Sequence, residues 1–243
     1  MQLDQYIAAS TLDYILITSA IIIAIILVSI FAKKADDRAK ALLFTAIAVP
    51  TILATLYTAG ATIYLNTIAE TGGPVHWHAD FEIYKCGQSV DLVDPTGLSN
   101  RVGTPVFHEH GDNRLHVEGV VVKKEDVSLG KFFEVVGGSL TPSGFSVPTN
   151  SGTANAANGE LCNGRPAKVQ VFAYRVVENP FQRTGMKHEQ TKLTEFEGYV
   201  PSPYSAVPPG DCIIIEFDAE KPSTDKICET YRIAIERGDL TEA

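Results

Sequence analysis

The sequence predicts two N-terminal transmembrane α-helices followed by an extracytoplasmic β-rich α+β region. Three features support this fold class: two long uncharged runs lie before residue 70, basic residues separate them, and polar and apolar residues alternate farther along the chain. We expect a two-helix membrane anchor at 1–71, a His-rich β domain with a short helix at 72–139, a linker at 140–165 and a small α+β subdomain at 166–243.

The first uncharged run extends from Tyr14 to Ala32, about the length that a helix needs to cross a hydrocarbon core of ~30 Å. The second run, 41–69, contains Pro50, which a membrane helix tolerates when its backbone groups find other partners. A cleaved signal peptide is the competing interpretation of the first run. Such a peptide would begin with basic residues, whereas residues 1–13 contain two Asp and no Lys or Arg. Both runs are therefore predicted to span the membrane.

The loop between the two runs carries positive charge. Its basic residues are Lys33, Lys34, Arg38 and Lys40. Basic residues in short loops are retained on the cytoplasmic side of a membrane. We therefore expect a cell-membrane protein whose two termini and C-terminal region, residues 72–243, lie outside the cytoplasm.

The exposed region is acidic. Once the four basic and four acidic residues before position 70 are set aside, 16 Lys+Arg stand against 25 Asp+Glu. Such a surface repels phosphate backbones and weakly concentrates cations. This charge argues against nucleic acid as a partner, leaving the membrane and a metal ion as the partners that we expect, with any protein partner unidentified.

All four cysteines lie in the exposed region: Cys86, Cys162, Cys212 and Cys228. An even number of cysteines in an oxidising compartment favours two disulfides, and three pairings are possible. A strand from Cys212 to Phe217 followed by a helix near Cys228 would separate these two cysteines by ~20 Å. The sequence therefore disfavours the pair Cys212–Cys228.

Periodicity predicts the elements of the exposed region. The stretch "HWHADFEIY" at 76–84 alternates as a half-buried strand does, with His76, His78, Asp80 and Glu82 on one face. A tight hairpin is expected at 111–113. The stretch "SLGKFFEVVGG" predicts a short helix with Ser128 as its N-cap, and the Ser-, Gly- and Asn-rich residues 139–160 predict a loop or linker.

Strands and a final helix are expected in the last third of the chain. The strands are "KVQVFAYRVV" and "DCIIIEF", the second after a "VPPG" turn, and the helix is "TDKICETYRIAIERG", capped by Thr224 and Gly238. The sequence contains no nucleophile-elbow motif, phosphate-binding loop, dinucleotide fingerprint or repeat.

Five of the six histidines are concentrated in 76–116. The candidate metal ligands are His76, His78, His108, His110 and His116, and the candidate residues that orient them are Glu118, Asp80 and Glu82. A three-residue loop at 111–113 places His108 opposite His116, whereas a two-residue loop separates them. Imidazole donors without thioether ligands favour copper(II) or zinc. The alternative is that these histidines are ordinary polar residues on the wet face of a sheet.

The motifs "HWHADFEIYKCG", "FHEHGDNRLHVEG" and "SLGKFFEV" resemble a loosely characterised group of prokaryotic membrane-anchored or secreted His-rich domains. The resemblance covers about 75–137, and "VPPGDCIIIEF" resembles the strand that ends their second module. Its pattern is carried here by His76, His78, His108, His110, His116 and Glu118. Gly111 precedes Asp112 where the group places Asp directly. The resemblance implies an extracytoplasmic His-rich site.

Three functions follow from these observations. The first is a transition-metal-binding protein for metal sensing, storage or delivery, which needs no catalytic residue. The second is a cupin-like metal-dependent enzyme, because His76, His78 and Glu82 have the H-x-H-x3-E spacing of the first cupin motif. The glycine that follows comes too early for that motif, and its second element is missing. The third is a structural surface protein without a metal.

Overall fold

The structure, a computed structural model, describes residues 3–31, 36–180, 182–201 and 210–243. The chain divides into two compact units, Met1–Gly73 and Pro74–Ala243. Lys33 and Lys34 of the basic loop lie outside the described residues, as do the first three residues of the expected "VPPG" turn.

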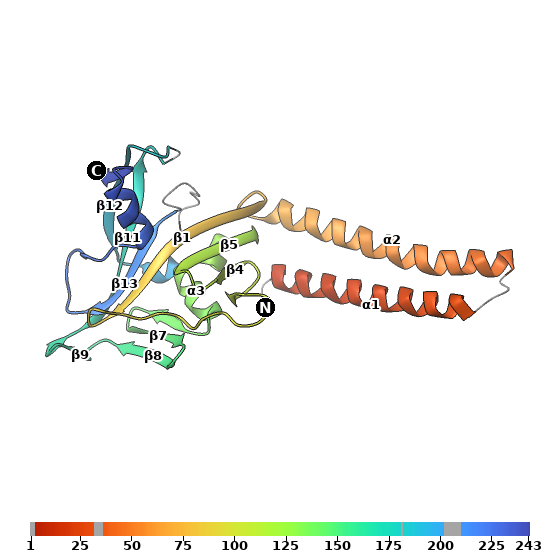
Figure 1. Ribbon diagram of the computed structural model, residues 1–243, viewed down its shortest axis with the longest axis horizontal. Helices are drawn as coiled ribbons and strands as arrows, with labels where there is room; N and C mark the ends of the chain where they lie inside the picture. The colour runs from red at the N-terminus through yellow and green to blue at the C-terminus, as the bar shows by residue number, and fades with distance from the viewer. Residues whose placement is uncertain (1–2, 32–35, 181, 202–209) are drawn as a thin grey trace. The chain divides into compact units, whose positions relative to one another are not determined.

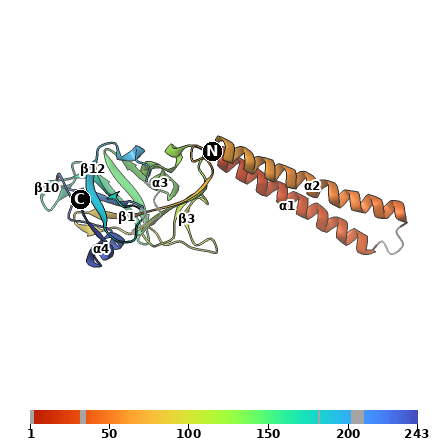
Figure 2. The same ribbon diagram turned by 90° about the horizontal axis from the view of Figure 1, so that it is seen from above.

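The first unit consists of two helices that run side by side, α1 (Leu3–Phe31) and α2 (Asp37–Ile68) (Figures 1 and 2). Both are long and apolar enough to cross a membrane, over Tyr6–Ile30 in α1 and over the whole of α2. The Asp36 carboxylate caps α2 by accepting a hydrogen bond from the backbone N–H of Ala39 at 2.8 Å. The two predicted apolar helices are therefore present.

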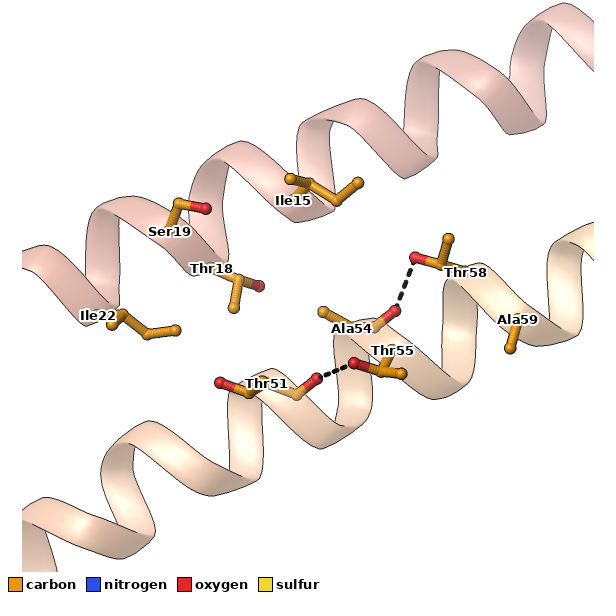
Figure 3. Close-up of a pocket in the computed structure, with 9 residues that line it drawn as sticks. All are labelled: Ile15, Thr18, Ser19, Ile22, Thr51, Ala54, Thr55, Thr58 and Ala59. Atoms are coloured by element: carbon orange, nitrogen blue, oxygen red, sulfur yellow. Dashed lines mark hydrogen bonds between the residues drawn. The ribbon is translucent and has the colours of Figure 1, made fainter.

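Hydroxyl groups lie between the two helices of this unit (Figure 3). They line a gap of about 480 Å³ together with small and branched apolar side chains: Ile15, Thr18, Ser19, Ile22, Thr51, Ala54, Thr55, Thr58 and Ala59. The hydroxyls of Thr55 and Thr58 each donate to the carbonyl four residues earlier, at 2.8 Å. These hydroxyls are thus satisfied within their own helix.

The second unit is built mainly from strands. They are β1 (Pro74–Lys85), β2 (Gln88–Ser89), β3 (Val102–Gly103), β4 (Phe107–Glu109), β5 (Arg114–Val120), β6 (Ser139–Thr141), β7 (Gly144–Thr149), β8 (Gly152–Ala157), β9 (Leu161–Cys162), β10 (Arg165–Pro166), β11 (Lys168–Glu178), β12 (Met186–Leu193), β13 (Cys212–Asp218) and β14 (Leu240–Glu242). Its helices are α3 (Leu129–Val135), α4 (Glu229–Glu236) and the short 3₁₀ helices Lys124–Val127 and Phe196–Gly198.

One mixed sheet of nine strands forms the centre of the unit, in the order β14-β12-β11-β13-β1-β5-β4-β3, with β2 paired to β1. Strand β1 lies in the middle, parallel to β13 and antiparallel to β5. Long strands formed where the sequence predicted them, at β1, β11 and β13, and β11 and β13 each contain six consecutive buried residues because both faces of the sheet are covered. Figure 1 shows β1 and β13 side by side at the centre.

The two faces of the sheet are covered differently. On one face, Phe81 and Phe107 of the strands contact Phe132 of α3, with ring centroids 5.1 and 5.4 Å apart. On the other face, Tyr231 of α4 packs with Phe172 and other residues of β11 and β13. Successive residues of β13 alternate between the two cores, which makes the unit three layers thick.

The stretch expected to be a linker, 140–165, instead forms strands. Strands β6, β7 and β8 make a three-stranded antiparallel sheet, and β9 pairs with β10. Leu140, Phe145 and Val147 are buried in the same core as α3. Since β1 pairs with both β5 and β13, the expected His-rich domain and C-terminal subdomain are parts of one sheet.

Small residues in this stretch permit close packing. A Cβ atom at Gly138 would lie 2.2 Å from the Ser146 carbonyl oxygen, and one at Gly144 would lie 2.1 Å from that of Ala156. Both distances are shorter than any real contact. The glycines that resemble linker composition are therefore places where the backbone lies close against that of an adjacent strand.

The disulfides are Cys86–Cys162 and Cys212–Cys228, so the prediction against the second pair was wrong. The prediction assumed that the chain continues away from the end of β13. Residues 219–227 instead return along the sheet, and α4 begins beside the first residue of β13. The Cα atoms of Cys212 and Cys228 are consequently 5.7 Å apart.

The N-cap expected for the last helix was also misplaced. Helix α4 begins at Glu229, with Cys228 as its N-cap residue. The Thr224 hydroxyl instead accepts a hydrogen bond from the Lys226 backbone N–H at 3.0 Å, in the turn before the helix. At the other end, the Gly238 N–H donates to the Ile235 carbonyl, as a helix-terminating glycine does. The predicted Gly238 end is therefore correct.

Candidate metal centre

Four of the five clustered histidines lie on three adjacent strands, β1, β5 and β4, and His110 directly follows β4. Residues that pair across antiparallel strands point to the same face of a sheet, and so do residues two apart along one strand. The cross-strand rows are His78, His116 and His108; His76 and Glu118; and Asp80 and Arg114. The opposite face of these strands carries Leu115, Val117 and Phe107, which are buried in the α3 core.

The hairpin between β4 and β5 determines this arrangement. Gly111 and Asn113 have positive φ angles, +80° and +55°, which tight turns need. The Glu109 carboxylate, on the core side, accepts the backbone N–H of Asp112 at 2.7 Å. Burial raises the pKa of Glu109. The resulting register places His108 opposite His116, as the three-residue loop predicted.

Ring nitrogens converge within each H-x-H pair. His76 Nε2 lies 2.9 Å from His78 Nε2, and His108 Nε2 lies 3.1 Å from His110 Nε2. His110 Nδ1 faces the Asn100 carbonyl oxygen, which can only accept a hydrogen bond. His110 Nδ1 must therefore carry the proton, which leaves the lone pair of neutral His110 on the Nε2 that faces His108.

His116 lies between the two pairs. Its ring centroid is 4.7 Å from those of both His78 and His110, and its ring stacks on that of His108 at 5.4 Å. His116 Nε2 is 3.5 Å from Asp112 Oδ2. Both ring nitrogens are buried, and neither makes a hydrogen bond within the described part of the chain.

Glu118 joins the two pairs. Its Oε1 lies 3.2 Å from His76 Nε2 and 3.7 Å from His116 Nδ1, while Oε2 lies 3.9 Å from His108 Nε2. The carboxylate therefore faces the ring nitrogens directly, in addition to any role in orienting one of them. Residues whose donor atoms all lie within 4.8 Å form two sets: His76, His78, His116 and Glu118; and His108, His110 and His116.

The protein environment keeps several of these rings neutral. Burial lowers the pKa of His116 to about 4, and the neighbouring His78 and His110 add to this effect while Asp112 opposes it. Burial lowers the pKa of His78 and His108 as well, followed by the neighbouring His76 and His110 respectively. A neutral imidazole has the lone pair that a metal requires.

The other predicted site residues lie apart from these sets. Asp80 is buried and accepts a hydrogen bond from Arg114 Nε at 2.7 Å, and Thr230 of α4 donates to its second oxygen. Glu82 accepts a hydrogen bond from the Tyr84 hydroxyl and belongs to neither set of donors. The H-x-H-x3-E spacing therefore does not bring Glu82 to the histidines, as a cupin metal site would require.

Sequence reasoning missed two contacts of the site, Asn100 and Asp112. Asp112 lies in the predicted hairpin, four residues before His116, so the turn itself was the signal for it. Asn100 belongs to a long turn-rich stretch, and its positive φ of +45° places its carbonyl near His110. No pattern in the sequence pointed to that second contact.

The comparisons with known proteins provide no relative for this site. No protein-family model matches the chain, and neither a curated protein nor a solved structure matches it.

Proposed function

We propose that this chain is a membrane-anchored, extracytoplasmic protein that binds a transition metal, copper(II) or zinc, through the histidine cluster for sensing, storage or delivery. The observation that carries the proposal is the convergence of five imidazoles and the Glu118 carboxylate on one sheet face. His116 contributes a buried Nδ1 with no hydrogen bond among the described residues.

Donor chemistry supports the choice of metal. Neutral imidazole is a preferred ligand of zinc and copper(II), and a carboxylate oxygen suits zinc as well. All four cysteines are paired in disulfides, so no thiolate is offered. The lowered pKa values of His78, His108 and His116 remove the need to expel a proton before binding.

Outer contacts support the same proposal. Ligand histidines usually donate their second N–H to a carbonyl or carboxylate, which fixes the ring. His110 Nδ1 meets the Asn100 carbonyl, and His116 Nε2 meets Asp112 at 3.5 Å. Either contact leaves the opposite ring nitrogen directed at the cluster.

The anchor and the disulfides support an extracytoplasmic location. Two helices of membrane-spanning length precede the β-rich unit, and two disulfides tie that unit together. Disulfides persist in oxidising compartments. Arg38 and Lys40 lie at the start of α2, the end of that helix which the positive-inside rule places at the cytoplasmic side.

Metal titration of the full-length chain in detergent tests the binding proposal. The metal-free protein is titrated with Cu(II) and with Zn(II) by calorimetry, and bound metal is counted by elemental analysis. We expect saturable binding that a chelator reverses. Glu189→Gln, an exposed carboxylate on β12, is the matched control for Glu118→Gln, which we expect to weaken binding about 10- to 100-fold. If the wild type binds neither metal, the histidines are structural residues of the hairpin and not metal ligands.

Protease accessibility in intact cells tests the location. A protease added outside should cleave after α2 and release the β-rich unit, because the charge bias places the short loop inside. Protection of this unit until the cells are lysed would reverse the topology. The same samples, alkylated without reduction, should show no free thiol.

A further inference from the structure

We infer that the cluster binds two metal ions side by side, with the Glu118 carboxylate bridging them. This inference rests on the proposed metal-binding function and specifies its stoichiometry and ligands. A protein site for zinc or copper commonly uses four donors, three of them from protein where one position stays open. The face between β1 and β4 offers five imidazoles and a carboxylate, more than one such ion accommodates.

The positions of the strands separate the donors into two groups. His76 and His78 lie on β1, His108 lies on β4 with His110 directly after it, and β5 runs between these strands. Adjacent strands are about 4.8 Å apart, so the two pairs start from backbones separated by about 10 Å. Within each pair the Nε2 atoms approach to 2.9 and 3.1 Å. Among the described residues, no set of donors within 4.8 Å contains both pairs.

Glu118 lies on β5, between the pairs, and turns one oxygen to each. Oε1 is 3.2 Å from His76 Nε2, and Oε2 is 3.9 Å from His108 Nε2. A carboxylate with this arrangement can bind one ion through each oxygen. Its negative charge also offsets the repulsion between two cations, which lie ~3.5 to 4 Å apart in two-metal sites.

His116 completes the first of the two ligand sets. Its Nδ1 is 3.7 Å from Glu118 Oε1, the oxygen that faces His76, and makes no hydrogen bond among the described residues. Its Nε2 faces Asp112, which suits the protonated nitrogen of a bound ring. The first ion is thus assigned His76, His78, His116 and Glu118 Oε1. The second is assigned His108 and His110, with Glu118 Oε2, 3.9 Å from His108 Nε2, as the bridging ligand and one position open. Glu118 belongs only to the first donor set, so its carboxylate must turn toward His108 when the second ion binds.

Copper(II) is the probe that tests this inference. The metal-free full-length chain is titrated with Cu(II) in detergent, bound copper is counted by elemental analysis, and electron paramagnetic resonance is recorded at each step. We expect two ions per chain. At saturation the two bridged ions should be magnetically coupled, so that the signal of isolated Cu(II) first rises and then falls.

Three variants locate the ions. His76→Ala/His78→Ala and His108→Ala/His110→Ala should each bind one ion with an isolated Cu(II) signal. Glu118→Gln should abolish the coupling and weaken the second ion by about 10-fold or more, whereas the control Glu189→Gln should behave as wild type. Circular dichroism of each variant verifies folding. The number of copper ions bound per wild-type chain and their magnetic coupling are measured without any variant, so they test the inference even if a variant does not fold.

The outcomes separate this inference from the proposed function. A wild-type chain that binds no copper overturns both. One ion per chain, lost in either double variant, retains the proposed function and overturns the two-ion site. Two ions without magnetic coupling, unaffected by Glu118→Gln, overturn the carboxylate bridge.

Discussion

His116 and His188 are both buried on the same face of the same sheet, and each has an Nδ1 with no hydrogen bond among the described residues. Their neighbours differ. His188, on β12, contacts the rings of Tyr174 and Tyr231 with centroids 5.7 and 5.9 Å apart, beneath α4. His116 is surrounded by imidazoles and two carboxylates.

The comparison shows that an unpartnered ring nitrogen does not by itself make a metal site. His188 fills the core between α4 and β11 as an aromatic ring would, and burial lowers its pKa just as it does for His116. Among the described residues, only the region around His116 places several further donor atoms within 4.8 Å of one another. The convergence of donors distinguishes a candidate ligand from a core histidine.

The largest effect that we expect is on stability, from His188→Ala. Removing a buried ring should lower the free energy of unfolding by about 3 kcal/mol, because the tyrosines cannot close the cavity. Denaturant unfolding of the metal-free chain, followed by tyrosine fluorescence, measures this loss. Metal affinity should stay within about twofold of wild type. A large loss of affinity with little loss of stability would make His188 a ligand.

His116→Ala should give the opposite pattern. We expect the affinity for Cu(II) or Zn(II) to fall about 100-fold, which corresponds to about 2.7 kcal/mol, because the only residue common to both donor sets is lost. Metal-free stability should change less than in His188→Ala, since the removed ring has two buried nitrogens without a hydrogen bond among the described residues, whereas His188 has one. Calorimetry gives the metal affinity, and denaturant unfolding of the same preparations gives the metal-free stability. Equal behaviour of the two variants would remove the distinction between the regions.

Lowering the pH should increase the difference in metal affinity between histidines in the folded chain and the same histidines in a short peptide. An ordinary imidazole protonates below a pKa of about 6.5 and stops binding metal, whereas the pKa of His116 is about 4 in the fold. We compare the full-length chain with a peptide of residues 107–118. Between about pH 7.5 and pH 5.5 the peptide should lose at least about tenfold more affinity than the chain. Parallel losses would show that the fold does not keep these rings neutral.

We expect the smallest effect on stability from a substitution at Thr230, which lies between the regions around His116 and His188. Thr230 of α4 donates to Asp80, and Arg114 binds the other oxygen of that carboxylate. Thr230→Val keeps the shape and removes one hydrogen bond, so we expect a loss of about 1 kcal/mol in stability. Metal affinity should be unchanged in the calorimetric titration. A shift in affinity as large as that of His116→Ala would place Asp80 in the metal site.

Local rules were enough to predict part of this site. The sequence restricted the hairpin to a two-residue or a three-residue loop, and the three-residue loop at 111–113 gives the observed pairing of His108 with His116. Alternation along 76–84 likewise placed His76 and His78 on one face. Both features depend on residues close together in the chain.

Long-range pairing accounts for what the sequence did not predict. The Cys212–Cys228 disulfide depends on the return of residues 219–227 along the sheet, and no local pattern specifies that path. The expected linker failed for a different reason: it was judged by composition, yet Gly138 and Gly144 are required by the close approach of neighbouring strands in a local three-stranded sheet. Strand β5 alone pairs Glu118 with His76, which determines where the carboxylate points.

The pairing of β1 with β13 also has a consequence for how the chain acquires its structure. Asp80 pairs with Cys212, so the centre of the sheet joins one of the first strands of this unit to one of the last. During synthesis, the hairpin at 107–120 emerges long before the strand that completes β1. Such distant contacts slow folding, because a long loop must close before they form. A chain that ends before residue 210 therefore leaves β1 and β11 without their shared neighbour, and we expect it to be degraded.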